Sequence, residues 1–453
     1  MSLSIIILAA GQGTRMKSSV PKVLHELAGK PLVQHVIDTA TSLEPSDIHL
    51  VYGHGADQLK ATITSPLNWV LQAEQLGTGH AVQQVRNDLP AEGVTLILYG
   101  DVPLVTSDTL RSLIGVAETN TIAVLSVKLD EPGGYGRIVR DENGKFIAIV
   151  EHKDATDEQR KIAEINSGIM AIQTDKLHEW LGSLTNNNAQ AEYYLTDLVA
   201  IAVNDQAPVE AILANSAEEV EGINDRVQLA KLERYFQRQQ ATNLMLSGVT
   251  LLDPERIDVR GNVRIGQDSS IDIDVIIEGD VKIGNNCRIG SHVVLKDCTL
   301  ANNVVIKSHT VVEGASIGDD CSIGPFARIR PGANFVADVH IGNFVEVKNS
   351  RLEKGVKAGH LSYLGDAEIG ERVNVGAGTI TCNYDGANKH KTVIEADVFV
   401  GSDTQLVAPV IVGKGTTIAA GTTVTQNVSD NCLVISRTKQ REIANWKRPV
   451  KNK

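Results

Sequence analysis

The chain has 453 residues, which is enough for two or three domains, and 42% of them are hydrophobic, which is enough for a sizeable core. The net charge of −12 is unevenly distributed, because residues 1–226 carry 16 Lys and Arg against 30 Asp and Glu, whereas residues 227–453 carry 27 against 25. The acidic first half argues against nonspecific nucleic-acid binding. No 18-residue apolar run or signal peptide is evident, and the five cysteines show no metal-binding spacing, so we expect a cytoplasmic protein with reduced thiols and no membrane span.

Residues 1–226 alternate short aliphatic runs with amphipathic stretches. We expect buried strands at 5–8, 48–52, 94–98 and 122–127, and intervening helices at 32–43, 79–85 and 107–117. This order predicts a Rossmann-like α/β domain with a mostly parallel sheet and helices on both faces. Ligands should then bind beyond the carboxyl ends of the strands.

The stretch from Asp225 to about Ser247 is charged and Gln-rich, and it contains neither Pro nor Gly. Its apolar residues fall near helical spacing, so we expect one long helix that ends before the helix-breaking Asp-Pro pair at 253–254. The sequence therefore predicts a first domain at 1–226, a linker helix at 227–247, and a second domain at 248–453 with a basic tail.

Aliphatic residues then recur every six positions, with occasional five-residue steps and one insertion at 382–393. Of the 28 repeat positions from Val259 to Val424, 25 are Val, Ile or Leu. Hexapeptide repetition predicts a parallel β-helix, in which three repeats make one triangular coil and neighbouring coils stack about 4.8 Å apart. We expect the long helix to join the α/β domain to a left-handed β-helix of about nine coils.

A glycine-rich string, LAAGQGTRM, follows the first predicted strand at positions 8–16, and Pro-Lys comes at 21–22. Gly11 and Gly13 allow backbone N–H groups to approach a phosphate, and Arg15 and Lys22 can neutralise a triphosphate. The string lacks both the third glycine of the dinucleotide fingerprint and the Gly-Lys-Ser/Thr of a P-loop. A lone Gly-x-Gly is also typical of a simple turn.

This whole string resembles the signature of sugar-phosphate nucleotidyltransferases, and further matching residues follow in order along the first half. The resemblance implies that UTP or the UDP-sugar contacts Leu8, Ala9, Ala10, Gly11, Lys22, Gln72, Gly77, Thr78, Tyr99, Gly100, Asp101, Gly136, Glu151, Asn166 and Asn224. It implies that Asp101 and Asn224 bind Mg²⁺ and that Arg15 and Lys22 are catalytic cations. Asp101 alone also has a plainer interpretation, a turn aspartate before a proline.

The β-helix register brings residues together without reference to any family. Arg330 and Lys348 share one repeat position a coil apart, so the two cations repel each other unless an anion such as a sugar phosphate bridges them. Alternatively, both side chains splay into solvent. His360 lies one coil below Ala377, and a small residue there leaves room for a ligand, although a lone histidine is more often a plain surface residue.

Together, the two halves resemble the bacterial family of bifunctional N-acetylglucosamine-1-phosphate uridylyltransferases and glucosamine-1-phosphate N-acetyltransferases. The resemblance implies that the second domain acetylates glucosamine 1-phosphate from acetyl-CoA, with His360 as the general base. The first domain would then join the product to UMP from UTP and release pyrophosphate. The resulting UDP-N-acetylglucosamine would feed peptidoglycan and lipopolysaccharide synthesis.

The same resemblance implies further binding residues and a homotrimer whose acetyl-transfer sites are shared between neighbouring β-helices. The implied contacts to the acceptor sugar are Arg330, Lys348, Tyr363 and Asn374. The implied contacts to acetyl-CoA are Ala377, Asn383, Tyr384, Ser402, Ala420 and Arg437, and the insertion at 382–393 could cover that ligand.

Two other hypotheses remain open. The β-helix could be only regulatory or oligomerising, or the chain could be a non-catalytic scaffold with a nucleotide-binding head. The basic tail that begins at Arg437 is either a solvated segment or an anion site for phosphates of the coenzyme.

Overall fold

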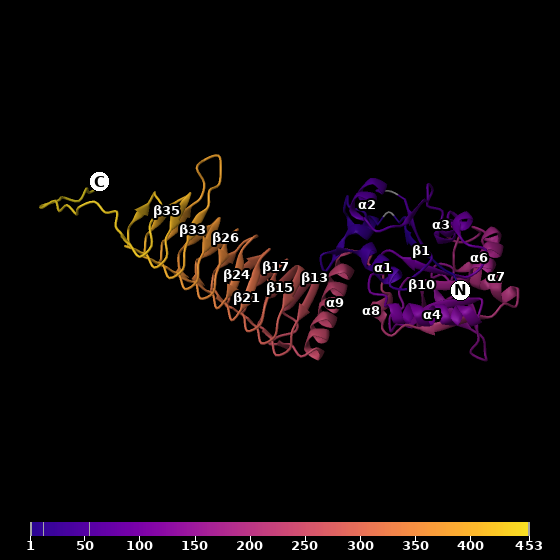
Figure 1. Ribbon diagram of the computed structural model, residues 1–453. Helices are drawn as coiled ribbons and strands as arrows, with labels where there is room; N and C mark the ends of the chain where they lie inside the picture. The colour runs from indigo at the N-terminus through magenta and orange to yellow at the C-terminus, as the bar shows by residue number, and fades with distance from the viewer. Residues whose placement is uncertain (1, 12, 54, 452–453) are drawn as a thin grey trace. The chain divides into compact units, whose positions relative to one another are not determined.

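The computed structural model describes residues 2–11, 13–53 and 55–451, and the chain divides into two compact units, Met1–Phe236 and Gln237–Lys453 (Figure 1). We call the first unit the head and the second the β-helix unit. The head is an α/β domain, and the β-helix unit is a stack of coils. Among the described residues, no helix is both long enough and apolar enough to cross a membrane.

The head is built on a sheet with the strand order β11-β7-β10-β6-β1-β4-β5. The strands are β1 (Leu3–Ala9), β4 (Asp47–Tyr52), β5 (Asn68–Leu71), β6 (Val94–Tyr99), β7 (Ile122–Lys128), β10 (Glu164–Gln173) and β11 (Val209–Leu213), with β8 (Arg137–Arg140) and β9 (Phe146–Val150) as a side branch. β1 pairs in parallel with both β4 and β6, whereas β10 is antiparallel to β6 and β7. The four predicted strands are confirmed, and β10 was not predicted, because a bulge between Asn166 and Met170 interrupts its alternation.

Alternate residues of the central strands enter two separate cores. Ile5 and Ile7 pack on one face with α1 (Leu32–Thr41) and α4 (Ser107–Thr119). Ile6 and Leu8 pack on the other face with α3 (Thr78–Gln83), α6 (Thr174–Trp180) and α7 (Asp197–Asn204). The near-continuous apolar runs in these strands are therefore those of a sheet that is covered on both faces.

A single helix, α9 (Arg226–Leu246), contributes to both units, as the stretch without Pro or Gly predicts. In the head, Leu232 packs with Ile223. In the β-helix unit, Ala241 and Leu244 join the core of the coils. The Gln237 side chain bonds to both backbone groups of Val259, at 2.9 and 2.8 Å, so it satisfies part of the exposed edge of the first coil.

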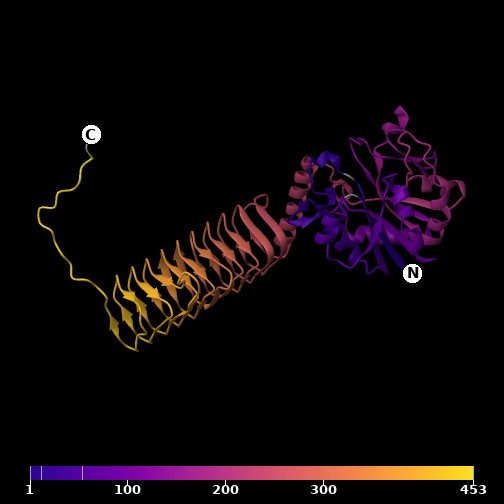
Figure 2. The same cartoon turned by 90° about the horizontal axis from the view of Figure 1, so that it is seen from above.

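The β-helix unit consists of parallel strands in two long ladders. One has eleven strands, from β12 (Thr250–Leu251) to β39 (Leu433–Val434), and the other has seventeen, from β13 (Ile257–Ile265) to β38 (Thr423–Val424) (Figure 2). Pairing partners lie 17 or 18 residues apart over most of the stack, as for Ile329 with Val347 and Ala358 with Val375. Three hexapeptides, or two and one pentapeptide, therefore make one coil.

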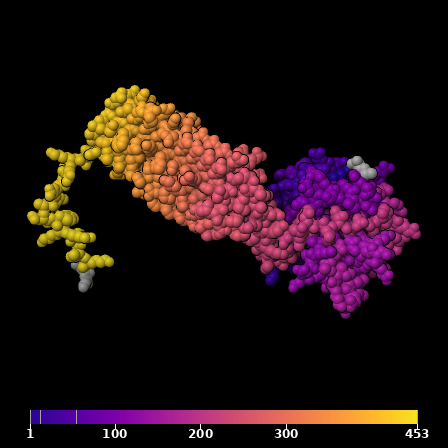
Figure 3. Space-filling model, turned by 90° about the horizontal axis from the view of Figure 1, so that it is seen from below, coloured from indigo at the N-terminus to yellow at the C-terminus, as the bar shows by residue number. Residues whose placement is uncertain are grey.

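All predicted inward positions of the repeat are buried except Ile265, which is half-buried. Cys287, Cys298 and Cys321 share this core, and all five cysteines are free thiols. The described segment after Val434 leaves the last coil as an exposed chain without strands, which Figure 3 shows as the narrow run of yellow atoms beyond the coils.

Candidate functional sites

A cavity of about 240 Å³ lies in the head at the carboxyl ends of β1, β5 and β6. Ten of the residues predicted to bind a nucleotide line it, namely Leu8, Ala9, Ala10, Gly11, Lys22, Gln72, Gly77, Thr78, Tyr99 and Asp101. Gln75 and Glu192 also line it and were not predicted, because they lie in loops without a distinctive pattern. The cavity is at the edge where an α/β sheet binds its ligands.

The glycine-rich turn brings Lys22 to this cavity. Gly13 has a φ of 62°, and a Cβ atom there would lie only 2.5 Å from Cβ of Lys22. The turn continues into a short 3₁₀ helix (Thr14–Met16), in which buried Met16 anchors the loop. Position 13 therefore requires a glycine, because its φ is positive and because Lys22 leaves no room for a Cβ atom.

Four predicted polar residues meet beside this cavity. The ammonium of Lys22 forms an ion pair with Asp101 and donates to Oδ1 of Asn224 at 3.0 Å. Nη2 of Arg15 donates to the same Asn224 oxygen at 2.9 Å. The two oxygens predicted to bind a metal ion therefore converge on one positive charge.

Three other residues predicted to contact the UDP-sugar, Gly136, Glu151 and Asn166, also lie together. The Asn166 amide donates to the Gly136 carbonyl at 2.9 Å, and a Cβ on Gly136 would lie 3.3 Å from the Glu151 carboxylate. Thr196 donates to Glu151 at 3.1 Å. Burial raises the pKa of Glu151, and the hydrogen bond from Thr196 opposes that shift.

Tyr99 connects the two groups of residues, because it lines the cavity and its ring packs against Gly168, whose amide donates to Oδ1 of Asn166 at 3.0 Å. Burial raises the pKa of Tyr99, so its hydroxyl stays a hydrogen-bond donor. The other predicted residue, Gly100, packs under the site, where its amide donates to the Leu8 carbonyl at 2.9 Å.

Within the described part of the chain, no cluster of three or more His, Cys, Asp or Glu side chains could hold a metal ion. The oxygens of Asp101 and Asn224 are nevertheless hard donors that already surround a cation, the Lys22 ammonium. They fit Mg²⁺, which commonly takes one or two protein ligands and completes its shell with water and phosphate oxygens.

In the β-helix unit, Arg330 and Lys348 lie at one corner of adjacent coils, as predicted. β23 (Arg328–Ile329) pairs in register with β26 (Glu346–Lys348), and the Arg330 amide donates to the Val347 carbonyl at 2.8 Å. Nη1 of Arg330 also pairs with Glu346 at 2.6 Å. Contact with the ammonium of Lys389, and then the charge of Arg330, lowers the pKa of Lys348. Three cations therefore gather at this corner.

Lys389 was not predicted, because it belongs to the loop at 383–391, which leaves the stack and returns (Figure 1). Asp385 shapes this loop by accepting from the amide of Asn388 at 2.7 Å and pairing with His390 at 2.7 Å. These contacts hold the pKa of Asp385 well below its usual range. Lys389 and His390 then line a cavity of about 470 Å³ over the coils.

The predicted residues Tyr363 and Asn383 lie at the same corner as the cations. Gly365 pairs with Lys348 one coil below, and a Cβ on Gly365 would meet the Tyr363 hydroxyl at 2.4 Å, so the ring of Tyr363 lies across this glycine. Asn383 donates to Asp366 at 2.5 Å and to the Tyr363 hydroxyl at 3.5 Å. Tyr384, the next loop residue, is exposed and donates to the Gly386 carbonyl at 2.6 Å.

His360 is exposed at the end of β28 (Lys357–His360), at a different corner from the cations. Its Nδ1 lies 2.9 Å from Oδ1 of Asn343, which is the paired residue one coil below. An amide oxygen can only accept, so a neutral imidazole in this contact carries its proton on Nδ1 and leaves the lone pair on Nε2. The imidazole is therefore oriented as a base.

A column of small residues lies in register above His360. The pairings of Ala358, Val375, Val400 and Ile418 in successive strands place Ala377, Ser402 and Ala420 one above the other. Nε of Arg437 donates to the Ala420 carbonyl at 2.9 Å and so begins the tail at the top of this column. Asn374 lies on the outer face of the eleven-stranded ladder, opposite Lys357, and is not brought to the corner of the cations.

Comparisons with known proteins agree with this division of the chain. A model of the MobA-like NTP transferase domain matches residues 5–160, and one of bacterial transferase hexapeptides (six repeats) matches residues 391–426. The chain joins an NTP-transferase domain to a hexapeptide-repeat domain. The predicted fold class, including a left-handed β-helix, is confirmed.

A model of the GMPPB C-terminal domain matches residues 259–351. A solved structure of UDP-glucose pyrophosphorylase complexed with UDP-glucose is 16% identical, with a TM-score of 0.45, and covers 53% of this chain and 100% of its own.

Proposed function

We propose that this chain catalyses two reactions of UDP-N-acetylglucosamine synthesis. The β-helix domain (248–453) acetylates glucosamine 1-phosphate from acetyl-CoA. The first domain (1–226), which the linker helix (227–247) joins to it and which makes up most of the head, transfers UMP from UTP to the product and releases pyrophosphate. The observation that carries the proposal is that two separate polar sites, one around Asp101 and one around His360, lie in different units of one chain.

In the head, Lys22 and Arg15 would neutralise the triphosphate while the sugar 1-phosphate attacks the α-phosphorus. Catalysis of phosphoryl transfer depends mainly on positioning and on charge neutralisation, which two cations beside a backbone cradle supply. Asp101 and Asn224 would hold Mg²⁺, which neutralises phosphate charge when bound. Glu151 and Asn166 would orient the amino sugar.

In the β-helix unit, Nε2 of His360 would take a proton from the 2-amine as this nitrogen attacks the thioester carbonyl. The new C–N bond forms as the C–S bond breaks, and the coenzyme leaves as a thiol once the proton on His360 passes to its sulfur. Arg330, Lys348 and Lys389 would bind the phosphate of the sugar. The coenzyme would lie along Ala377, Ser402 and Ala420, a column about 14 Å long from His360, with phosphates near Arg437.

We further propose that the acetyl-transfer site is completed by neighbouring copies in a homotrimer. His360 and the cations occupy opposite ends of the wall that contains β29 (Tyr363–Gly365). Beside His360, Phe326 and Phe344 stack 5.5 Å apart and stay 48% and 55% exposed. Exposed stacked aromatic rings are typical of a surface that a second chain covers.

The proposal is tested by incubating the pure protein with glucosamine 1-phosphate, acetyl-CoA, UTP and Mg²⁺ and identifying the product by mass. We expect UDP-N-acetylglucosamine. His360→Ala should lower acetylation by about 10²–10⁴-fold and leave uridylyl transfer intact, whereas Asp101→Ala should do the opposite. Loss of both activities in either folded variant would contradict two independent sites. Wild-type protein that forms UDP-sugar but releases no coenzyme thiol would support a β-helix that only regulates or assembles.

A further inference from the structure

Two segments of the head that carry the proposed metal ligands lie side by side and run in opposite directions. Residues 101–106 lead from β6 to α4, and residues 219–224 lead from α8 (Ala217–Val220) to α9. The Ile223 amide donates to the Asp101 carbonyl at 2.9 Å, which joins the segments at the proposed metal site. Five residues away, Thr106 meets Glu219, which joins them at the other end.

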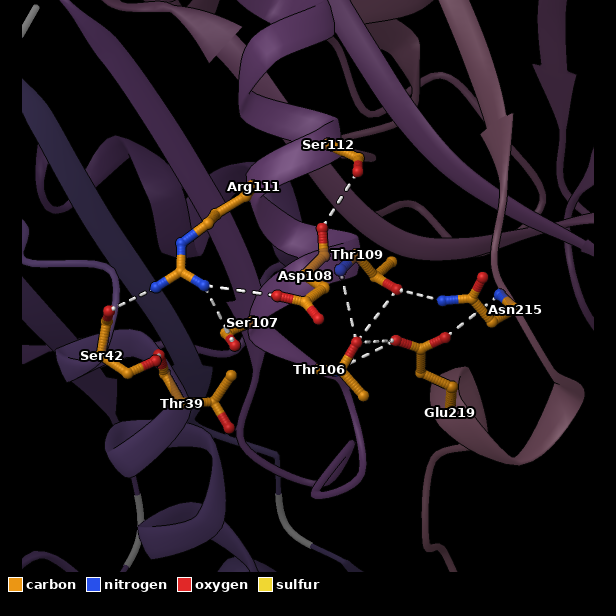
Figure 4. Close-up of polar contacts among 10 residues, drawn as sticks. All are labelled: Thr39, Ser42, Thr106, Ser107, Asp108, Thr109, Arg111, Ser112, Asn215 and Glu219. Carbon is orange, nitrogen blue, oxygen red and sulfur yellow. Dashed lines mark hydrogen bonds and ion pairs between the residues drawn. The ribbon is translucent and has the colours of Figure 1, made fainter.

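Glu219 makes the second junction with a buried carboxylate. Glu219 as a whole is only 4% exposed, and its Oε1 accepts from the Thr106 hydroxyl at 2.7 Å and from the Thr106 amide at 3.1 Å (Figure 4). Oε2 accepts from the Asn215 amide at 3.1 Å. Among the residues that the structure describes, no basic side chain forms an ion pair with Glu219, so these neutral donors compensate for its burial.

The hydrogen bonds of Glu219 close a ring. The Thr106 hydroxyl also accepts from the Thr109 amide at 3.3 Å and thereby caps α4. The Asn215 side chain donates to the Thr109 hydroxyl at 2.9 Å (Figure 4). Each polar group of the ring is thus held by two others, which fixes the relative position of the two segments. A second link is apolar, because Val105 and Val220 are both 3% exposed in one core.

We propose that Glu219 is a positioning residue for the uridylyl-transfer site, because it holds the segment of Asn224 against the segment of Asp101. The proposal rests on the proposed function of the head. Neither Glu219 nor Thr106 contacts the cavity, so their effect on a ligand passes only through the two segments. Without the hydrogen bonds of Glu219, only the apolar core of Val105 and Val220 is left at this end, and the oxygens of Asp101 and Asn224 no longer keep a fixed separation.

The experiment measures binding of Mn²⁺ by electron paramagnetic resonance in the presence of α,β-methylene-UTP, so that its readout does not depend on turnover. Glu219→Gln places an amide –NH₂ against backbone and hydroxyl donors, and Thr106→Val removes the hydroxyl with little change in shape. We expect both variants to raise the dissociation constant of Mn²⁺ about tenfold, the loss typical of residues that orient metal ligands.

Two matched variants serve as controls. Thr106→Ser keeps the hydroxyl and should bind Mn²⁺ within twofold of the wild type, whereas a role in shape alone would also impair it. Asp108→Ala removes an exposed partner of Arg111 on the same helix and should have no effect. The urea midpoint of the head, followed by tryptophan fluorescence, to which buried Trp180 contributes, shows that each variant is folded.

The outcomes separate this inference from the proposed function. Wild-type Mn²⁺ affinity in Thr106→Val, the milder substitution, would overturn the positioning role even if Glu219→Gln failed to fold. Asp101→Asn should weaken Mn²⁺ binding regardless of Glu219. If Asp101→Asn binds Mn²⁺ as the wild type does, the metal site itself is wrong, and the proposed function of the head fails with it.

Discussion

Replacing Gly342 by alanine should damage both the stability of the β-helix unit and acetyl transfer, although Gly342 contacts no proposed ligand. Gly342 lies in β25 (His340–Asn343), directly before Asn343. A Cβ atom at this position would lie 1.8 Å from the carbonyl oxygen of Gly359 in the next coil, directly before His360. The clash therefore occurs beneath the hydrogen bond that orients the proposed base.

The size of the effect follows from this distance. Real Cβ contacts are not found below 3.0 Å, so the two coils must separate locally by at least 1.2 Å, and the obstructing atom belongs to backbone that is fixed by its ladder. Such overpacking should destabilise the unit by about 3 kcal/mol, the upper end of the usual range. For a unit of this size, that corresponds to a melting temperature lower by about 6–12 °C.

Gly359→Ala is the matched control, because Gly359 lies one coil above on the same wall and its Cβ would meet nothing within 4 Å. The assay follows far-UV circular dichroism for the coils and tryptophan fluorescence for the head, where Trp180 is buried. We expect Gly342→Ala to lower only the transition of the coils, and acetyl transfer to fall as the Asn343 contact is lost. Equal melting temperatures of the coils for Gly342→Ala and Gly359→Ala would refute the reasoning.

Three further predictions concern thiols and charges. With a thiol-specific reagent at pH 8, exposed Cys432 should react first, and the three buried thiols should react only after unfolding. Burial raises the pKa of Cys298 to about 12 from its usual 9.0. The unfolded chain therefore loses the thiol proton at lower pH than the folded chain, and the stability of the β-helix unit should fall as the pH rises from 9 to about 12. Cys298→Ala should reduce this fall. Lys389→Met should raise KM for glucosamine 1-phosphate about tenfold and leave KM for acetyl-CoA within twofold, because one of three cations is lost. An unchanged KM for glucosamine 1-phosphate would show that Lys389 does not belong to the proposed phosphate site.

The repeat made the β-helix unit largely predictable. An aliphatic residue every six positions fixes which side chains point inward, and the pairing of Ile329 with Val347 then places Arg330 beside Lys348 without further information. The same arithmetic, run downward from His360 by one coil of 17 residues, leads to Asn343. That residue was missed because only the coil above His360 was considered.

Other parts of the sites could not be predicted from spacing. Lys389 reaches the cations only because the turn of Asp385 folds its loop back over the coils, and no repeat describes that loop. In the head, the glycine-rich string predicted correctly where the cavity lies, because residues 8–11 line it. The contact between Thr106 and Glu219 joins residues 113 positions apart through a buried carboxylate, which resembles an ordinary surface glutamate in the sequence.

The two units use different physical means to fix their polar groups. In the β-helix unit, the ladder positions Arg330, Lys348 and His360, because each coil sets the height and register of the next. A further contact, with Asn343, orients His360. In the head, Asp101 and Asn224 leave their strands and helices in loops, where no ladder fixes them. The buried ring of hydrogen bonds around Glu219 then keeps these two loops at a fixed distance from each other. For this reason, a substitution remote from the ligand should impair the site of the head when it removes a buried polar contact, and the site of the β-helix unit when it causes a steric clash between coils.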